Sequence, residues 1–192
     1  MLVLFAVFYS ITVHAQIIYV ENGFSKSRMY SKIPALTKYI TNYSLSAGVE
    51  YFIHRNYELS SEIGYLVKGG KEINLLPELE NNPEKMNFLQ LNTTFRGKLA
   101  KNNEVLYVGI GPKLDFSLDK NSSLHGFYSE YKTNSIVYGL ITEIGTKTQF
   151  NGKYTIGLSA TYFIDFNPIA FTKYNNMRNS TFLFSLSAGY AL

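Results

Sequence analysis

The chain has 192 residues, a formal net charge of +4, 16 Tyr and 14 Phe, but no Trp and no Cys. The lack of Cys excludes a disulfide framework and a thiolate metal site, and Lys and Arg form no basic run of the kind that indicates nucleic-acid binding. Charged residues make up 17% of the chain, fewer than in ordinary soluble domains. The aromatic excess favours strands, and the length fits one domain.

The N-terminus begins with an apolar run, MLVLFAVFYSITVHA, over residues 1–15. The run ends in Val13-His14-Ala15, which predicts a signal peptide cleaved after Ala15, with a single barrel domain over 16–192. It is too short to cross a bilayer as a helix, which needs about 20 apolar residues. Residues 1–15 contain no Lys or Arg, unlike most signals, so the alternative is an apolar segment retained in the fold.

After Gln16, apolar and polar residues alternate with a period of two in segments of about ten residues, the length of a tilted membrane strand. The pattern is clearest at the C-terminus, where Phe182, Phe184 and Leu186 alternate with Leu183, Ser185 and Ser187. Eight such segments are predicted, at 16–24, 43–54, 58–68, 89–99, 106–118, 136–150, 154–166 and 182–192. An even number of strands is what a bacterial single-chain barrel requires.

The connections between these segments alternate between short and long. Short turns are predicted at Arg55-Asn56, 101–103 and Asn151-Gly152, the last a pair suited to a type I′ turn. Long loops are predicted at about 25–42, 69–85, 119–134 and 167–179. Three short periplasmic turns and four long outer loops are typical of outer-membrane barrels. Pro112 lies within a predicted strand, where we expect a bulge or a local break.

Charge distinguishes the two faces of these strands, because the apolar face carries none. The other face carries six acids and five bases: Glu50, Glu58, Glu62, Lys68, Arg96, Lys98, Lys113, Asp115, Glu143, Lys147 and Asp165. We therefore predict an all-β, eight-stranded antiparallel transmembrane up-and-down barrel in the outer membrane of a Gram-negative bacterium, with the charges inside and the apolar face in lipid. The alternative is a soluble lipocalin-like carrier with an apolar interior.

An eight-stranded barrel leaves an interior just wide enough for side chains to fill. We therefore predict a structural charge network in the lumen rather than a pore. Its expected members are Glu50, Glu62, Arg96, Lys113, Asp115, Glu143, Lys147 and Asp165.

Little in the sequence indicates catalysis. Ser122, Ser123 and His125 share one predicted loop, and a lipid-modifying enzyme is the second alternative function. No nucleophile-elbow motif accompanies them, and His54 and His125 lie far apart without Cys partners. We predict no catalytic residue, no cofactor and no metal.

Basic residues gather in the first and last long loops, which closure of the barrel makes neighbours. These are Lys26, Arg28, Lys32, Lys38, Lys173 and Arg178. Such a cluster is suited to the phosphates of outer-leaflet lipopolysaccharide, and the alternative is an ordinary solvated rim.

Three segments resemble the PorT-like group of outer-membrane β-barrel domain proteins, whose size is similar to that of the barrel of outer-membrane protein A. They are Tyr43–Tyr51 (YSLSAGVEY), Leu106–Pro112 (LYVGIGP) and Ser187–Leu192 (SAGYAL). The last resembles the signal read by the barrel-assembly machinery, although it ends in Leu192 where that signal usually ends in Phe. The resemblance implies a membrane-resident barrel with a structural, interaction, secretion-accessory or envelope role, with an envelope protein as partner, and supplies no catalytic residue.

Overall fold

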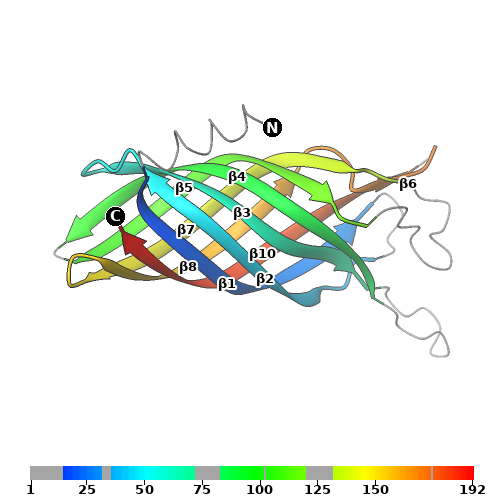
Figure 1. Cartoon of the computed structure of the whole chain (residues 1–192). Helices are drawn as coiled ribbons and strands as arrows, with labels where there is room; N and C mark the ends of the chain where they lie inside the picture. Colours follow the sequence, from blue (N-terminus) through cyan, green and yellow to red (C-terminus); the bar gives the residue numbers. More distant parts are fainter. Residues whose placement is uncertain (1–14, 32–35, 72–82, 102, 120–131, 174) are drawn as a thin grey trace.

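The computed structural model describes residues 15–31, 36–71, 83–101, 103–119, 132–173 and 175–192. Its eight long strands form one antiparallel sheet in chain order, and the first strand pairs with the last, so the sheet closes into a barrel (Figure 1). These strands are β1 (Ala15–Tyr30), β2 (Ile40–Tyr51), β3 (Tyr57–Gly70), β4 (Glu84–Lys101), β5 (Glu104–Ser117), β7 (Ile136–Phe150), β8 (Tyr154–Asp165) and β10 (Asn176–Ala191). The predicted fold is confirmed.

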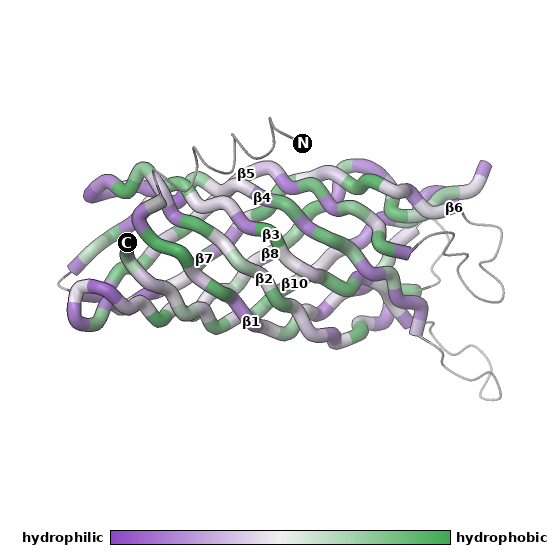
Figure 2. Tube along the Cα trace, in the orientation of Figure 1, coloured by the Kyte–Doolittle hydropathy of each residue, from purple (hydrophilic) through white to green (hydrophobic). Residues whose placement is uncertain are grey.

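The alternation read from the sequence corresponds to the inside and outside of the barrel. Along β10, Phe184 and Leu186 are exposed whereas Leu183 and Ser185 are buried. Hydrophobic and hydrophilic residues alternate along the long strands in Figure 2. This is expected because successive side chains of a strand point to opposite faces.

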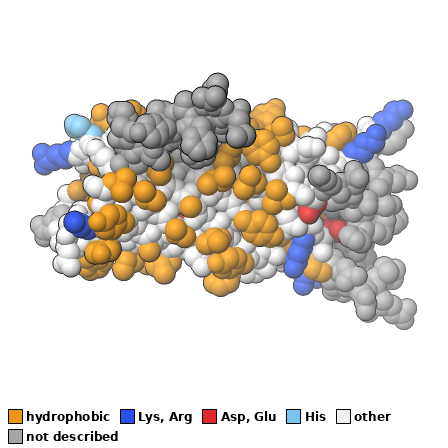
Figure 3. Space-filling model, viewed as in Figure 1, with side chains coloured by type: hydrophobic (Ala, Val, Ile, Leu, Met, Phe, Trp, Pro, Cys, Tyr) orange, Lys and Arg blue, Asp and Glu red, His pale blue; other side chains and the backbone are white. Residues whose placement is uncertain are grey.

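The apolar side chains that face outward cover the middle of the barrel, while Lys and Arg lie toward its two ends (Figure 3). Phe184, Leu158 and Ile156 are each at least half exposed, whereas Glu62 and Lys147 face the interior. This orientation contradicts the soluble carrier with an apolar interior, because the charges occupy the inside. In the described part of the chain, no helix is long and apolar enough to cross a membrane.

The tight turns and the C-terminus lie at one end of the barrel (Figure 1). Asn151 and Gly152 both have positive φ, 50° and 68°, and the N–H of Lys153 donates to the carbonyl of Phe150. These are the features of the predicted type I′ turn. The prediction for the first turn is wrong: β2 ends at Tyr51 instead of continuing to His54, and the connection spans 52–56. Its first residue, Phe52, has a φ of 50°, which ends the strand.

Pro112 does not interrupt β5. The β4–β5 register is the same on both sides of it, at Asn92 opposite Lys113 and Phe95 opposite Ile110, so there is no bulge. The pairing of β4 is interrupted between these two positions, opposite Pro112, because proline has no N–H to donate. The predicted local break is therefore limited to the pairing between β4 and β5, and the predicted bulge is absent.

At the opposite end, the strands continue beyond their predicted limits. β1 continues to Tyr30, and β10 begins at Asn176 rather than Phe182. The long strands have 12 to 18 residues, more than the roughly 9–11 that cross a bilayer. Two short strands, β6 (Lys132–Thr133) and β9 (Ala170–Phe171), extend the sheet beside the start of β10. The sequence prediction assigned residues 25–42 and 167–179 to long loops, whereas part of each belongs to β1 and β10.

Candidate functional site

Arg96, on β4, lies at the centre of a buried cluster in the half of the lumen nearest the tight turns. Its Nε and Nη2 donate to the two carboxylate oxygens of Glu143 at 2.6 and 3.1 Å, and its Nη1 donates to Glu50 at 3.0 Å. The guanidinium also lies 4.7 Å from the centre of the Tyr107 ring. Glu143 therefore receives the bidentate contact that a guanidinium makes best, and the ring adds a cation–π contact.

The same cluster extends toward the tight turns through two lysines. Lys147 Nζ donates to Glu50 and Glu58 at 2.6 Å each, and Lys98 Nζ donates to Glu58 at 2.9 Å. Glu62 accepts a hydrogen bond from Asn92 at 3.2 Å. Pairing of this kind is required when carboxylates and ammonium groups are removed from water.

A second ionic cluster lies farther from the tight turns. Lys68 and Lys113 each donate to both Asp115 and Asp165, at distances between 2.5 and 3.1 Å, so two cations and two anions form a ring. Gln90 donates to the remaining oxygen of Asp115 at 2.8 Å. The side chains of all four charged residues are at most 1% exposed. The lumen at this level is closed to water.

Two apolar layers accompany the ionic clusters. The first consists of Leu66, Ile141, Phe163 and Leu183. Leu66 and Phe163 lie two residues before Lys68 and Asp165 on strands that lead away from the tight turns, so this layer separates the two ionic clusters. The second closes the far end of the lumen and consists of Met29, Leu36, Met86, Phe88, Val137, Ile169, Ala170 and Met177.

The outer apolar layer is completed by a segment folded over the mouth of the barrel. Ile169 and Ala170 are fully buried. Hydrogen bonds hold them there: the N–H of Ile169 donates to the carbonyl of Met177 at 2.8 Å, and the N–H of Asn134 donates to the carbonyl of Ile169 at 3.0 Å. Ile169 thus helps to close the mouth of the barrel between β10 and β6.

All eight residues predicted to face the lumen point into it, and they fall into the two clusters above. Glu50, Glu62, Arg96, Glu143 and Lys147 share the first, and Lys113, Asp115 and Asp165 share the second. Sequence reasoning missed Tyr19 and Glu21, which also face inward on β1: Tyr19 OH donates to Glu62, and Glu21 accepts from Ser185 at 2.6 Å. The alternation of Ile17, Tyr19 and Glu21 with Ile18 and Val20 was the signal for them.

The predicted basic residues do not all lie in loops. Lys26 and Arg28 lie on β1 and Arg178 lies on β10, all three facing outward. The assignment of these three to loops is wrong, because the hydrogen-bonded ladder between β1 and β10 continues past the apolar belt to Tyr30. Lys38 and Lys173 lie in connections and are exposed, and Lys32 lies outside the described residues.

No group of three or more His, Asp or Glu side chains suited to a metal occurs among the described residues. Ser122, Ser123 and His125 lie outside the described residues, as do residues 1–14 of the predicted signal peptide.

Comparison with known proteins agrees with this closed, lipid-facing barrel. The family model described as "Outer membrane protein beta-barrel domain" matches residues 12–162. The chain belongs to this family. Its place is the outer membrane of a Gram-negative bacterium. No curated protein matches the sequence significantly.

Solved structures share the fold at low sequence identity. The outer membrane protein OprG from Pseudomonas aeruginosa has a TM-score of 0.64 at 13% identity, with 93% of this chain and 97% of that chain covered. Neisserial surface protein A has a TM-score of 0.56 at 12% identity, with 91% and 97% covered. Outer Membrane Protein W from E. coli has a TM-score of 0.51 at 13% identity, with 93% and 99% covered. These likenesses concern the fold alone.

Proposed function

We propose that this protein is a non-conducting outer-membrane barrel with a structural and interaction role in the cell envelope. The observation that carries the proposal is the filled lumen. Two ionic clusters and two apolar layers succeed one another along its axis. A solute would have to displace paired charges and packed side chains at four levels, so the functional surfaces are the outside and the two rims.

Conductance of the purified full-length protein in planar bilayers tests this proposal. We expect no stepwise opening, because every layer contains fully buried side chains. A matched variant, Ile169→Gly with Phe88→Ala, removes part of the outer layer and the contact of the Phe88 ring with Lys68 but leaves the ion pairs of both clusters, and it should also remain closed. Reproducible single-channel openings by the unaltered protein would contradict the proposal.

We further propose a PorT-like role, accessory to secretion or to upkeep of the envelope, with an envelope protein as partner and with the barrel-assembly machinery engaged during biogenesis. The support is the resemblance of Tyr43–Tyr51, Leu106–Pro112 and Ser187–Leu192 to that group. A deletion strain should then lose secreted cargo or become permeable to antibiotics that the outer membrane normally excludes. Normal secretion together with normal permeability would exclude both roles.

The lipid-modifying enzyme is not the function favoured by the described residues, because the buried carboxylates of the lumen are held by cations and lie away from the surface. Replacing His125 with Ala tests that alternative directly. Hydrolysis of outer-membrane lipid by the purified protein, abolished in this variant, would support the enzyme.

A further inference from the structure

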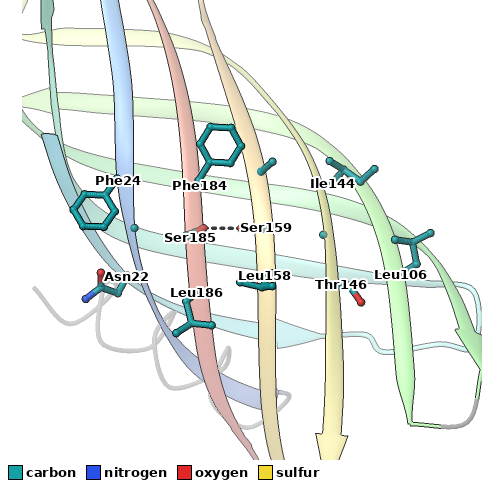
Figure 4. A pocket seen from close by; sticks show the side chains of 13 residues that line it. Asn22, Phe24, Leu106, Ile144, Thr146, Leu158, Ser159, Phe184, Ser185 and Leu186 are labelled. Carbon is teal, nitrogen blue, oxygen red and sulfur yellow. Dashed lines mark hydrogen bonds between the residues drawn. The ribbon is translucent and has the colours of Figure 1, made fainter. Parts of the chain in front are cut away.

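A groove of about 860 Å³ runs across the outside of the barrel where β1, β10, β8, β7 and β5 lie side by side. Its walls are the exposed apolar side chains of Phe24, Phe184, Leu158, Leu186, Ile144 and Leu106 (Figure 4). The volume falls within the range of about 300–1,000 Å³ that is typical of ligand sites. The groove lies in the belt that faces acyl chains.

The groove exists because one residue of its floor, Ala160 on β8, is much smaller than its neighbours on the two adjacent strands. Phe184 pairs with Ala160, and Ala160 pairs with Ile144, so a single methyl group lies between two large side chains. The polar side chains of the lining include Asn22, Ser159 and Ser185. The amide of Asn22 donates to Tyr43 OH at 2.6 Å, and the hydroxyls of Ser159 and Ser185 are hydrogen-bonded to each other at 2.6 Å (Figure 4). The polar groups of these three residues are therefore satisfied within the protein, and the rest of the wall is mainly apolar.

Directly beyond the groove, β1 and β10 carry basic residues on their outer face. Lys26 follows Phe24 by two residues on β1 and so lies on the same face about 7 Å farther along the strand. Arg28 pairs with Ser180, and Tyr30 pairs with Arg178, so Arg28 and Arg178 are diagonal neighbours, within roughly 7–8 Å at the backbone. The guanidinium of Arg28 lies 4.9 Å from the centre of the Tyr39 ring, which orients it at this edge.

The cations lead into a polar pocket of about 440 Å³ at the rim. Its lining includes Tyr30, Thr172, Lys173, Asn176 and Arg178. The sequence contains no Asp or Glu from residue 25 to residue 49, or after Asp165. No acidic side chain of these segments competes with an anion for the basic groups.

We infer that the groove, the cations and the polar pocket form one binding site for a phosphorylated, multiply acylated glycolipid of the outer leaflet, of the lipid A type. An acyl chain occupies the groove at Ala160, phosphate binds Lys26, Arg28 and Arg178, and the sugar lies against Tyr30 and Asn176. Along β1 and β10 the apolar groove is followed by cations and polar side chains at the rim, as the acyl chains of such a lipid are followed by the phosphorylated sugars that carry them. The site depends on the outward face of the barrel and not on whether the lumen is closed.

The test uses the full-length protein in phosphatidylcholine nanodiscs and bis-phosphorylated, hexa-acylated lipid A as the probe, with bound lipid counted by native mass spectrometry. Replacing Lys26, Arg28 and Arg178 with Gln should weaken binding by at least about tenfold, since one charge-assisted hydrogen bond contributes roughly that much. The matched control replaces Arg55, Lys101 and Lys153, which are exposed at the opposite rim, and should bind normally.

The groove is tested separately with Ala160→Leu, which fills it without touching a charge. This variant should also bind lipid A less well, whereas Ala47→Leu, an outward alanine of β2 that does not line the groove, should not. Heat-modifiable gel migration checks that each variant folds. Unchanged binding by both the triple Gln variant and Ala160→Leu would overturn the site.

Two further probes distinguish the ligand chemistry. Dephosphorylated lipid A should bind weakly, and so should phosphatidylglycerol, which has one phosphate and two chains. Equal binding of either probe would overturn the assignment to a phosphorylated glycolipid. Channel activity has no bearing on these measurements, so failure here is distinguishable from failure of the non-conducting role.

Discussion

Arg96 on β4 and Glu143 on β7 form a bidentate ion pair across an intervening strand, with Arg96 Nε 2.6 Å from Glu143 Oε1. Between them in register is Gly109 of β5, which pairs with Arg96 on one side and Glu143 on the other. A Cβ at Gly109 would lie 2.4 Å from Glu143 Oε1 and 2.7 Å from its Cγ. The glycine thus provides the space through which the two side chains meet.

Replacing Gly109 with Ala should therefore displace Glu143 from Arg96 and lower the free energy of unfolding by about 1–3 kcal/mol, as overpacking commonly does. Gly97→Ala is the matched control, because its nearest atom would be the carbonyl oxygen of Val108 at 3.9 Å. Urea unfolding in detergent, followed by far-ultraviolet circular dichroism, gives both values. Equal losses in the two variants would show that the space at Gly109 has no such role.

Removing the guanidinium is expected to have a larger effect. Arg96→Met leaves Glu143 without either of its hydrogen bonds from Arg96 and Glu50 without one. Loss of one partner from a buried ion pair destabilises by about 3–5 kcal/mol. The same unfolding titration should show little change for Arg55→Met, because Arg55 is exposed in a turn. A loss of less than about 1 kcal/mol for Arg96→Met would mean that the cluster contributes little.

In the second ionic cluster, each of Lys68 and Lys113 contacts both Asp115 and Asp165. This arrangement predicts strong coupling between the effects of substitutions on the free energy of unfolding. Lys113→Met alone leaves two carboxylates with one cation, and Asp165→Leu alone leaves two cations with one carboxylate. The double variant retains the balanced pair of Lys68 and Asp115 at 2.6 Å. Its loss of stability should be smaller than the sum of the single losses by about 0.5–3 kcal/mol. Additive losses would indicate that the four residues do not act as one unit.

A substitution in the turn between β7 and β8 tests the effect of backbone conformation separately from side-chain packing. Gly152 has a φ of 68°, and no heavy atom beyond its two chain neighbours lies within 4 Å of the position where its Cβ would be. Gly152→Ala should therefore cost about 1–2 kcal/mol from the left-handed conformation alone. Asn56→Ala, in the first connection, serves as the comparison. If Gly152→Ala proved neutral in urea unfolding, the type I′ geometry would be wrong.

Much of the fold was predictable because lipid imposes one simple rule on every strand. The alternation of Phe182, Phe184 and Leu186 with Leu183, Ser185 and Ser187 identifies both a strand and its outer face. Outside the lipid belt this rule no longer applies. Arg28 and Arg178 were assigned to loops because charge on the outer face resembles a loop, although the ladder continues beneath them.

The lumen was predictable in composition but not in order. Charged residues that alternate with the outward apolar residues had to point inward. Which carboxylate pairs with which cation depends on how the strands are aligned with one another, and the sequence does not state that alignment. Met29, Ile169 and Met177 were not predicted to close the mouth, because they belong to different, distant segments that meet only after β1 and β10 pair. Nothing local in the sequence around Ile169 marks it as buried.

The central claim, that apolar side chains face lipid while charged ones face the lumen, is tested most directly by a cysteine scan of β8. The chain has no native cysteine, so single substitutions from residue 155 to 162 can each carry a nitroxide label in a lipid bilayer. Collision with oxygen should be high at Ile156, Leu158 and Ala160 and low at Thr155, Gly157 and Thr161. A flat profile, or maxima at Thr155, Gly157 and Thr161, would contradict the account.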